Sequence, residues 1–221
     1  MATPDLGVLT GRIYGTAQGA IRRGLITRLT GGADREDWTS WAARQTGAVR
    51  RWVADLLAAA GRRVVAVLAR LLPPRWRGEV MRRVDSAHLR AAAQVVTAYR
   101  RAVVAGSTDV RSRAAAVRRT LNRLLAAGVT AFVDRTGRRW SIAAYLAMVA
   151  ATAQTAAEVE RVMRSGVRRA RVAGGPGECE RYCRPWIGRV IQLGGTGPRT
   201  LYAARRAGLF HPNCRCRLVP S

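Results

Sequence analysis

Apolar residues recur every three or four positions through the first 106 residues, which is the spacing of one face of an α-helix. In the segment 12–29 the apolar positions are Ile13, Ala17, Ala20, Ile21, Leu25 and Leu29. The run GGAD at 31–34 interrupts this pattern. We therefore predict a first helix that ends there.

A second apolar stripe, rich in tryptophan, follows the break. It consists of Trp38, Trp41, Val49, Trp52, Val53, Leu56 and Leu57. Tryptophans at helical spacing are typical of a buried helix face, so we assign the three rings to the core and give them no binding role. The pair Pro73-Pro74 must end the helix, because proline has no amide proton and disfavours helical geometry in the residue before it.

A third helix is predicted from about residue 78 to residue 104. His88 lies next to its apolar side, and no cysteine or second histidine is near it in the sequence. We interpret His88 as a packed or half-exposed side chain rather than a metal ligand. The run AGSTD ends this helix, and Ser107 or Thr108 would cap a fourth helix that stops at Gly128.

The pattern changes after residue 128, where the apolar residues Val129, Ala131 and Val133 recur at every second position. Alternation predicts a short strand, and the following RTG predicts a turn. Ser141 is a good N-cap for the next helix, and Trp140 with Tyr145 would form a hydrophobic staple at its start. We predict that this helix ends near Gly166.

Beyond residue 166 the chain is rich in loop residues. The elements predicted there are a strand at GRVIQL, residues 188–193, and a short helix at TLYAARRAG, residues 200–208. The fold class is therefore mainly α: an extended N-terminal helical region over 1–128, followed by a small α+β module over 129–221 that a Cys/His cluster closes. We expect these two ranges to be the domains.

The chain has a formal net charge of +26, and it contains arginine but no lysine. The apolar fraction of 48% argues against a disordered chain. Such a cationic chain attracts polyanions, so we expect double-stranded DNA as a partner, with an acidic protein surface second and anionic lipid third. No base-reading motif is present, so binding would be non-specific. The arginines expected to contact DNA are Arg168, Arg169, Arg171, Arg181, Arg184, Arg189, Arg205, Arg206, Arg215 and Arg217.

Neither a membrane span nor a secretory route is indicated. The most apolar window, residues 53–72, contains one aspartate and three arginines, which argues against a span. No N-terminal segment has the residue order of a signal peptide. We therefore expect the cysteines to fold in a reducing compartment, which favours thiolate chemistry over disulfides.

Five candidate metal donors lie in two groups, Cys179 with Cys183 and His211 with Cys214 and Cys216. Zinc needs four such donors on short segments, and the predicted strand between the groups could fold them together. Three interpretations remain open: structural zinc through four of the five, free buried cysteines beside a capping histidine, or a disulfide. In any of them, Trp186 and Phe210 would supply the small core, and Pro212 would fix the turn.

We expect no enzymatic activity and assign no catalytic residue. Metal-dependent phosphodiester cleavage usually needs clustered carboxylates or several histidines. Beyond Glu178 and Glu180 no acidic residue occurs as far as Ser221. His211 could serve as a base for Cys183 or Cys214, but nothing in the sequence marks a substrate pocket.

Three stretches of the C-terminal half carry discriminating motifs: DRTGRRWSIAAYLAMVAAT, CRPWIGRVIQL and TLYAARRAGLFHPNCRC. Together they resemble the phage minor capsid protein 2 family, which is related to the Mu F-like head morphogenesis proteins. Cys216 stands where the family more often has histidine, as in the Mu F-like variant. The helices before these motifs resemble the family's helical lead-in with lower specificity.

The resemblance implies a structural, low-copy minor head protein of a tailed phage. We expect the phage portal protein and a major capsid or scaffold protein as partners, with residues 1–128 contacting portal or capsid and several copies per particle. The expected location is the virion, inside the capsid near the portal, and the host cytoplasm during assembly. The alternative is a stand-alone nucleic-acid-binding protein, or a nuclease or toxin-type effector delivered with the phage genome.

Overall fold

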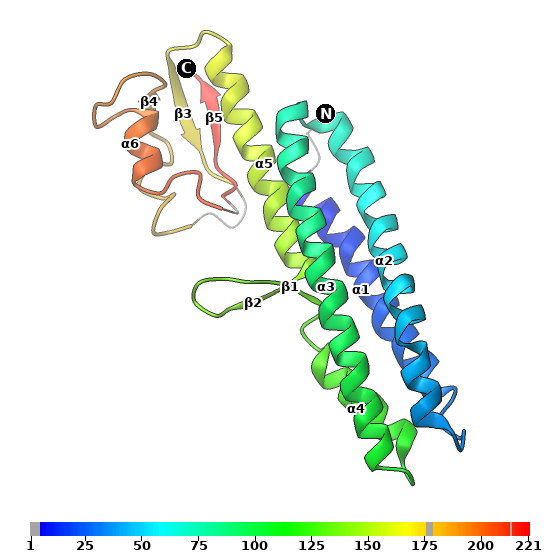
Figure 1. Ribbon diagram of the computed structural model, residues 1–221. Coiled ribbons are helices and arrows are strands. Elements are labelled where there is room, and N and C mark those ends of the chain that lie inside the picture. Colours follow the sequence, from blue (N-terminus) through cyan, green and yellow to red (C-terminus); the bar gives the residue numbers. More distant parts are fainter. Residues whose placement is uncertain (1–4, 176–178, 213) are drawn as a thin grey trace. The chain divides into compact units, whose positions relative to one another are not determined.

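The computed structural model describes residues 5–175, 179–212 and 214–221. Within them the chain is mainly helical, and a small β module and a Cys/His cluster lie toward the C-terminus, which confirms the predicted fold class. The elements in chain order are α1 (Leu6–Thr30), α2 (Trp38–Leu71), α3 (Pro74–Thr108), α4 (Arg113–Leu124), β1 (Thr130–Val133), β2 (Arg139–Ser141), α5 (Ile142–Arg164), β3 (Arg169–Ala173), β4 (Val190–Gln192), α6 (Leu201–Arg206) and β5 (Arg217–Pro220) (Figure 1).

The chain divides into two compact units, each assembled from separate segments. The helical unit consists of Thr10–Ala66 and Arg82–Leu146. The C-terminal unit consists of Met1–Leu9, Val67–Met81 and Ala147–Ser221. The sequence predicted two continuous domains, 1–128 and 129–221. That division stays a prediction, which limited proteolysis would test.

In the helical unit, α1, α2 and α3 are long neighbouring helices (Figure 1). Trp38 is fully buried, and its indole N–H donates to the Leu29 carbonyl at 3.4 Å. A Cβ on Gly106 would lie 2.5 Å from this ring, so glycine lets α3 approach it. Tyr99 donates its hydroxyl to the Ala42 carbonyl at 2.7 Å. These contacts confirm that Trp38 belongs to the core.

His88 lies in the same helical packing, as the sequence indicated. Its Nε2 is 2.7 Å from the hydroxyl of the fully buried Tyr14. Gly61 of α2 faces the imidazole, and a Cβ there would lie 3.1 Å from Cε1. Burial lowers the pKa of His88, so the neutral ring is favoured.

Helix α2 ends at Leu71, just before the proline pair, as predicted, but the predicted start of the third helix near residue 78 and the predicted capping role of Ser107 or Thr108 are wrong. Helix α3 begins at Pro74, because proline is well suited to the first turn, where its missing amide proton would have no helical partner. It also continues through Ser107, whose hydroxyl donates to the Val103 carbonyl instead of capping α4. The residue before α4 is Ser112, and its N–H donates to the Asp109 carboxylate.

The predicted strand and turn become an antiparallel hairpin of β1 and β2. The aromatic pairing at the start of α5 differs from the predicted staple. The ring stacked on Tyr145 is Phe132, with centroids 4.8 Å apart, whereas the Trp140 indole donates to Asp134 at 3.0 Å. Ser141 caps α5 as predicted, with its Oγ accepting from the Ala144 N–H at 3.2 Å.

Helix α5 is, within the described residues, the one helix long and apolar enough to cross a membrane by length and composition. A single helix of this kind is weak evidence, because the core helix of a soluble protein meets the same criterion. Ile142, Leu146, Ala150 and Val159 are buried inside the protein, which accounts for the apolar character of α5.

The C-terminal unit contains a three-stranded antiparallel sheet in the order β4-β3-β5. The sequence predicted only β4 of these strands. The buried face of the sheet carries Ala170 and Val172 of β3, Ile191 of β4 and Leu218 of β5. Leu201 and Ala204 of α6 belong to the same hydrophobic cluster. Trp186 and Phe210 are partly buried against this cluster.

Candidate functional site

The end of α6 directs the chain toward the cysteines. The Gly208 N–H donates to the Arg205 carbonyl, and the Leu209 N–H donates to the Ala204 carbonyl, which together form a Schellman motif. Gly208 has a φ of +98°, and a Cβ there would lie 2.7 Å from the ring of Tyr182. Glycine is thus required by both backbone conformation and space.

Two residues later the backbone is strained. Phe210 has a φ of +62°, a conformation that bulky residues rarely adopt. The Cys214 N–H donates to the His211 carbonyl at 2.9 Å, so the chain turns between them with Pro212 at the second position. Thr155 of α5 donates its hydroxyl to the Cys214 carbonyl at 3.0 Å. This turn is therefore anchored from α5, a contact that the sequence did not predict.

Cys183 reaches the same point from the other cysteine group. Its N–H donates to the Cys179 carbonyl at 2.9 Å, as in one turn of a helix. Its Sγ lies 3.6 Å from the Cys214 Sγ and 3.3 Å from the His211 Nε2. The three donor atoms lie within 4.8 Å of one another. The structure thus brings together side chains from the two groups, as the sequence predicted.

The separations resemble those of a tetrahedral zinc site. With Zn–S of about 2.3 Å and Zn–N of about 2.05 Å, two thiolates lie about 3.8 Å apart, and a thiolate lies about 3.6 Å from an imidazole nitrogen. The observed values of 3.6 and 3.3 Å are each within about 0.3 Å of these. A disulfide would need its sulfurs about 2.05 Å apart, and all four cysteines are free.

The histidine ring is oriented for ligation. His211 Nδ1 is 2.8 Å from the Pro212 carbonyl, which can only accept a hydrogen bond. Nδ1 therefore carries the proton, and Nε2 presents its lone pair to Cys183. A backbone carbonyl that fixes the tautomer of a ligating histidine is the usual outer-shell arrangement.

Cys216 is the remaining buried thiol next to this group. Its N–H donates to the Cys214 Sγ at 3.4 Å, and its own thiol interacts with those of Cys183 and Cys214, although it lies outside the three-donor group. Burial raises the pKa of the Cys216 thiol and, to a smaller extent, that of Cys183. Cys179 is half-buried and lies outside the three-donor group found among the described residues.

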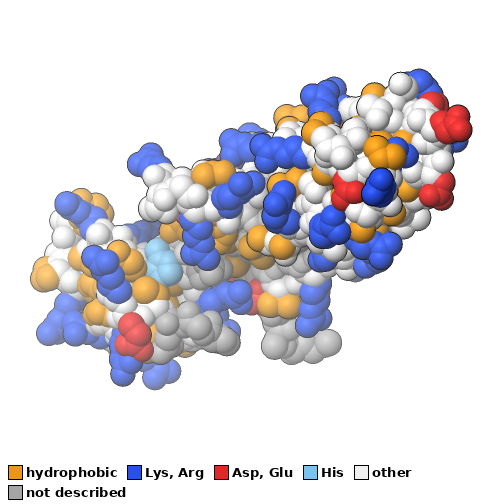
Figure 2. Space-filling model, turned by 90° about the horizontal axis from the view of Figure 1, so that it is seen from below, with side chains coloured by type: hydrophobic (Ala, Val, Ile, Leu, Met, Phe, Trp, Pro, Cys, Tyr) orange, Lys and Arg blue, Asp and Glu red, His pale blue; other side chains and the backbone are white. Residues whose placement is uncertain are grey.

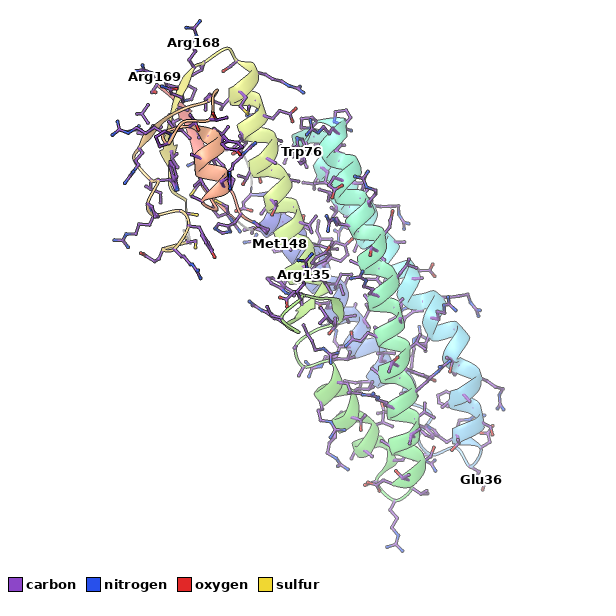
Figure 3. The ribbon with its side chains drawn as sticks, turned by 60° about the vertical axis from the view of Figure 1, so that its left-hand side comes forward. Glu36, Trp76, Arg135, Met148, Arg168 and Arg169 are labelled. Atoms are coloured by element: carbon purple, nitrogen blue, oxygen red, sulfur yellow. The ribbon has the colours of Figure 1, made fainter. Side chains whose placement is uncertain are left out.

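A basic face lies on the same sheet, on the side opposite its apolar face. Arg169 and Arg171 alternate with the buried Ala170 and Val172 along β3, so both arginines point outward. Arg217 begins β5 and is also exposed. We call Arg169, Arg171 and Arg217 the basic sheet face. Figure 3 shows Arg168 and Arg169 extending outward at the start of β3.

The other arginines predicted to bind DNA have varied surroundings. Arg184 pairs with Glu180, and Arg215 pairs with Asp5, so their charges are partly neutralised. Arg168, Arg189, Arg205, Arg206 and Arg181 are exposed, the last two lying over the rings of Tyr202 and Tyr182. Figure 2 shows how widely basic side chains are spread over one face of the molecule, and how few acidic ones accompany them.

Comparison with known proteins gives one match. The family model described as phage minor capsid protein 2 matches residues 81–220, which include the cysteine and histidine cluster and the whole sheet. Searches of curated proteins and of solved structures found no match. Because the family model covers more than half of the chain, this protein belongs to the phage minor capsid protein 2 family.

Proposed function

We propose that this chain is a structural head protein that associates with the portal inside the capsid and contacts packaged double-stranded DNA through the basic sheet face. Family membership supports a place in the virion among other phage head proteins. A capsid family is also consistent with a structural rather than an enzymatic role. The observation that supports DNA contact is the sheet face itself.

Three arginines on one sheet face suit a phosphate backbone better than a base sequence. Guanidinium groups bind phosphate through paired hydrogen bonds, and such contacts position a protein on DNA without reading bases. No ion pair involves Arg169, Arg171 or Arg217 in the described part of the chain. Their charges are therefore available to a polyanion, and the formal charge of +26 adds a general attraction.

The same proposal includes a zinc ion that holds this unit closed. Cys183, His211 and Cys214 would be three ligands. Cys216 would be the fourth, because it is buried, its N–H donates to the Cys214 sulfur and its thiol interacts with those of Cys183 and Cys214. A zinc with four protein ligands is structural, because no position remains open for a substrate. The metal would join the segment before β4 to the segment before β5, and so tie both edge strands of the sheet.

The DNA contact is tested by the variant R169Q/R171Q/R217Q. If each arginine contacts one phosphate, the slope of log affinity against log salt should fall by about 2.7 for a DNA duplex. The matched control is R50Q/R62Q/R63Q, which removes three exposed charges from α2. Equal changes in both variants would show that net charge, rather than this face, drives binding.

The place in the particle is tested separately. Phage heads carrying a tagged copy of the chain should yield cross-links between its residues and the portal protein, identified by mass spectrometry. Cross-links to tail components alone, or absence of the chain from purified heads, would contradict the proposed location.

A further inference from the structure

A hollow of about 420 Å³ in the helical unit gathers arginines from three different elements. Arg101 comes from α3, Arg123 from the last turn of α4, and Arg139 from β2. Thr97, Thr130 and Ser141 also line it. We call this hollow the arginine pocket. None of the residues assigned to DNA contact above lies in it.

Regular secondary structure explains why these side chains meet. Arg101 follows Thr97 by four positions on α3, so the two share one helix face. Arg139 and Ser141 are two positions apart on β2, and therefore lie on the same side of the hairpin. Thr130 pairs directly with Ser141 across the hairpin, which adds its side chain to that side.

The wall between α4 and β1 is held by two glutamines. The Val129 N–H donates to the Gln18 side chain at 2.8 Å, and the Thr130 N–H donates to the side chain of Gln94. Gly128 has a φ of +84°, and a Cβ there would lie 2.4 Å from the Gln18 oxygen. Both backbone donors are thus satisfied and the loop is closely packed, so contacts within the protein hold this wall of the pocket in place.

The charges in the pocket are uncompensated. No carboxylate occurs among the described residues that line it, and no ion pair involving Arg101, Arg123 or Arg139 is present there. The nearest acid on the hairpin, Asp134, accepts from the indole of Trp140, which alternation places on the side opposite Arg139. Ser141 also precedes α5, whose N-terminal dipole adds positive potential.

We propose that the arginine pocket binds the phosphate group of a nucleotide, either within DNA or as a free nucleotide. Three arginines from separate elements line one hollow, and guanidinium groups suit an oxyanion with several acceptor atoms. The volume lies within the range of small-molecule sites, so a phosphate can enter together with its sugar. Phosphate binding by the pocket does not depend on the proposed capsid role. Only the case in which the phosphate belongs to packaged DNA rests on that role.

The test compares R101Q/R123Q/R139Q with the charge-matched control R100Q/R118Q/R135Q, whose three arginines are exposed and do not line the pocket. Binding of inorganic phosphate, of deoxyadenosine monophosphate and of a short DNA duplex is measured by calorimetry on the full chain. Each lost charge-assisted contact should weaken phosphate binding by about tenfold. The control should bind as the unaltered chain does.

The outcomes separate the ligand sources and the two proposals. A larger loss of duplex affinity than of monophosphate affinity in R101Q/R123Q/R139Q identifies DNA as the ligand of the pocket, and the reverse identifies a free nucleotide. The sheet-face variant R169Q/R171Q/R217Q should retain monophosphate binding, even if it binds DNA poorly. Equal loss in the pocket and control variants, or no phosphate binding by the unaltered chain, would overturn the proposed pocket.

Discussion

Two cysteines, Cys179 and Cys216, lie outside the three-donor group, and the proposal assigns the fourth zinc position to Cys216. The Cys183 sulfur lies within about 0.3 Å of tetrahedral separation from both the Cys214 sulfur and the His211 Nε2. If Cys216 completes the site, C216S should weaken zinc affinity by about 100-fold or more, whereas C179S should change it by less than about threefold.

The measurement is competition with a chromophoric chelator, repeated with cobalt(II) in place of zinc. Cobalt in a tetrahedral thiolate site absorbs by charge transfer, and the intensity grows with the number of thiolates. The unaltered chain and C179S should show three thiolates, and C216S should show two. The C179S protein is the matched control, because it also loses one thiol from the same unit.

Zinc should also raise the stability of the C-terminal unit. At a free zinc concentration of about 1,000 times the Kd, the gain is about 4 kcal/mol, and chelation should remove it. Because burial raises the pKa of Cys216 and Cys183, zinc must displace protons from both, so affinity should fall as pH falls. Zinc affinity unaffected by C183S, C214S and C216S would refute the site, and a loss in C179S but not in C216S would transfer the fourth position to Cys179.

Further predictions concern the glycine before the histidine turn and the buried tyrosine. Both Gly166 and Gly208 have positive φ, but only Gly208 faces a ring, that of Tyr182. G166A should therefore cost about 1 kcal/mol and G208A about 2–4 kcal/mol in urea unfolding, with equal losses refuting the steric argument. Y14F leaves the partly buried His88 nitrogen without its partner and should cost about 1–2 kcal/mol, whereas an unchanged stability would show that water replaces the hydroxyl. Burial lowers the pKa of His88, so the unfolded chain takes up its proton first; stability should fall as pH drops below about 6.5, and H88Q should reduce that dependence.

Local sequence pattern determined most of the helical architecture. Helix formation depends on residues three and four positions apart, so the stripes and the break at 31–34 were sufficient to predict α1 and α2. Chemistry-bearing residues were also evident, because Cys183, His211 and Cys214 are few and lie in motifs shared with the minor capsid family. Helix ends were less predictable. Proline can follow the end of one helix and also begin the next, as Pro74 does, and serine can cap a helix or bond to a carbonyl inside one, as Ser107 does.

Only the tertiary structure decided which residues act together. Strands β3 and β5 were missed because RARVA and RLVP gain strand character from pairing with each other across more than forty residues, a contact no local pattern encodes. The same pairing turned a run of arginines into one exposed sheet face. The arginine pocket was equally invisible, since Arg101, Arg123 and Arg139 come from separate elements. Short-range periodicity specifies secondary structure, whereas a site depends on where the packed backbone places side chains that are distant in sequence.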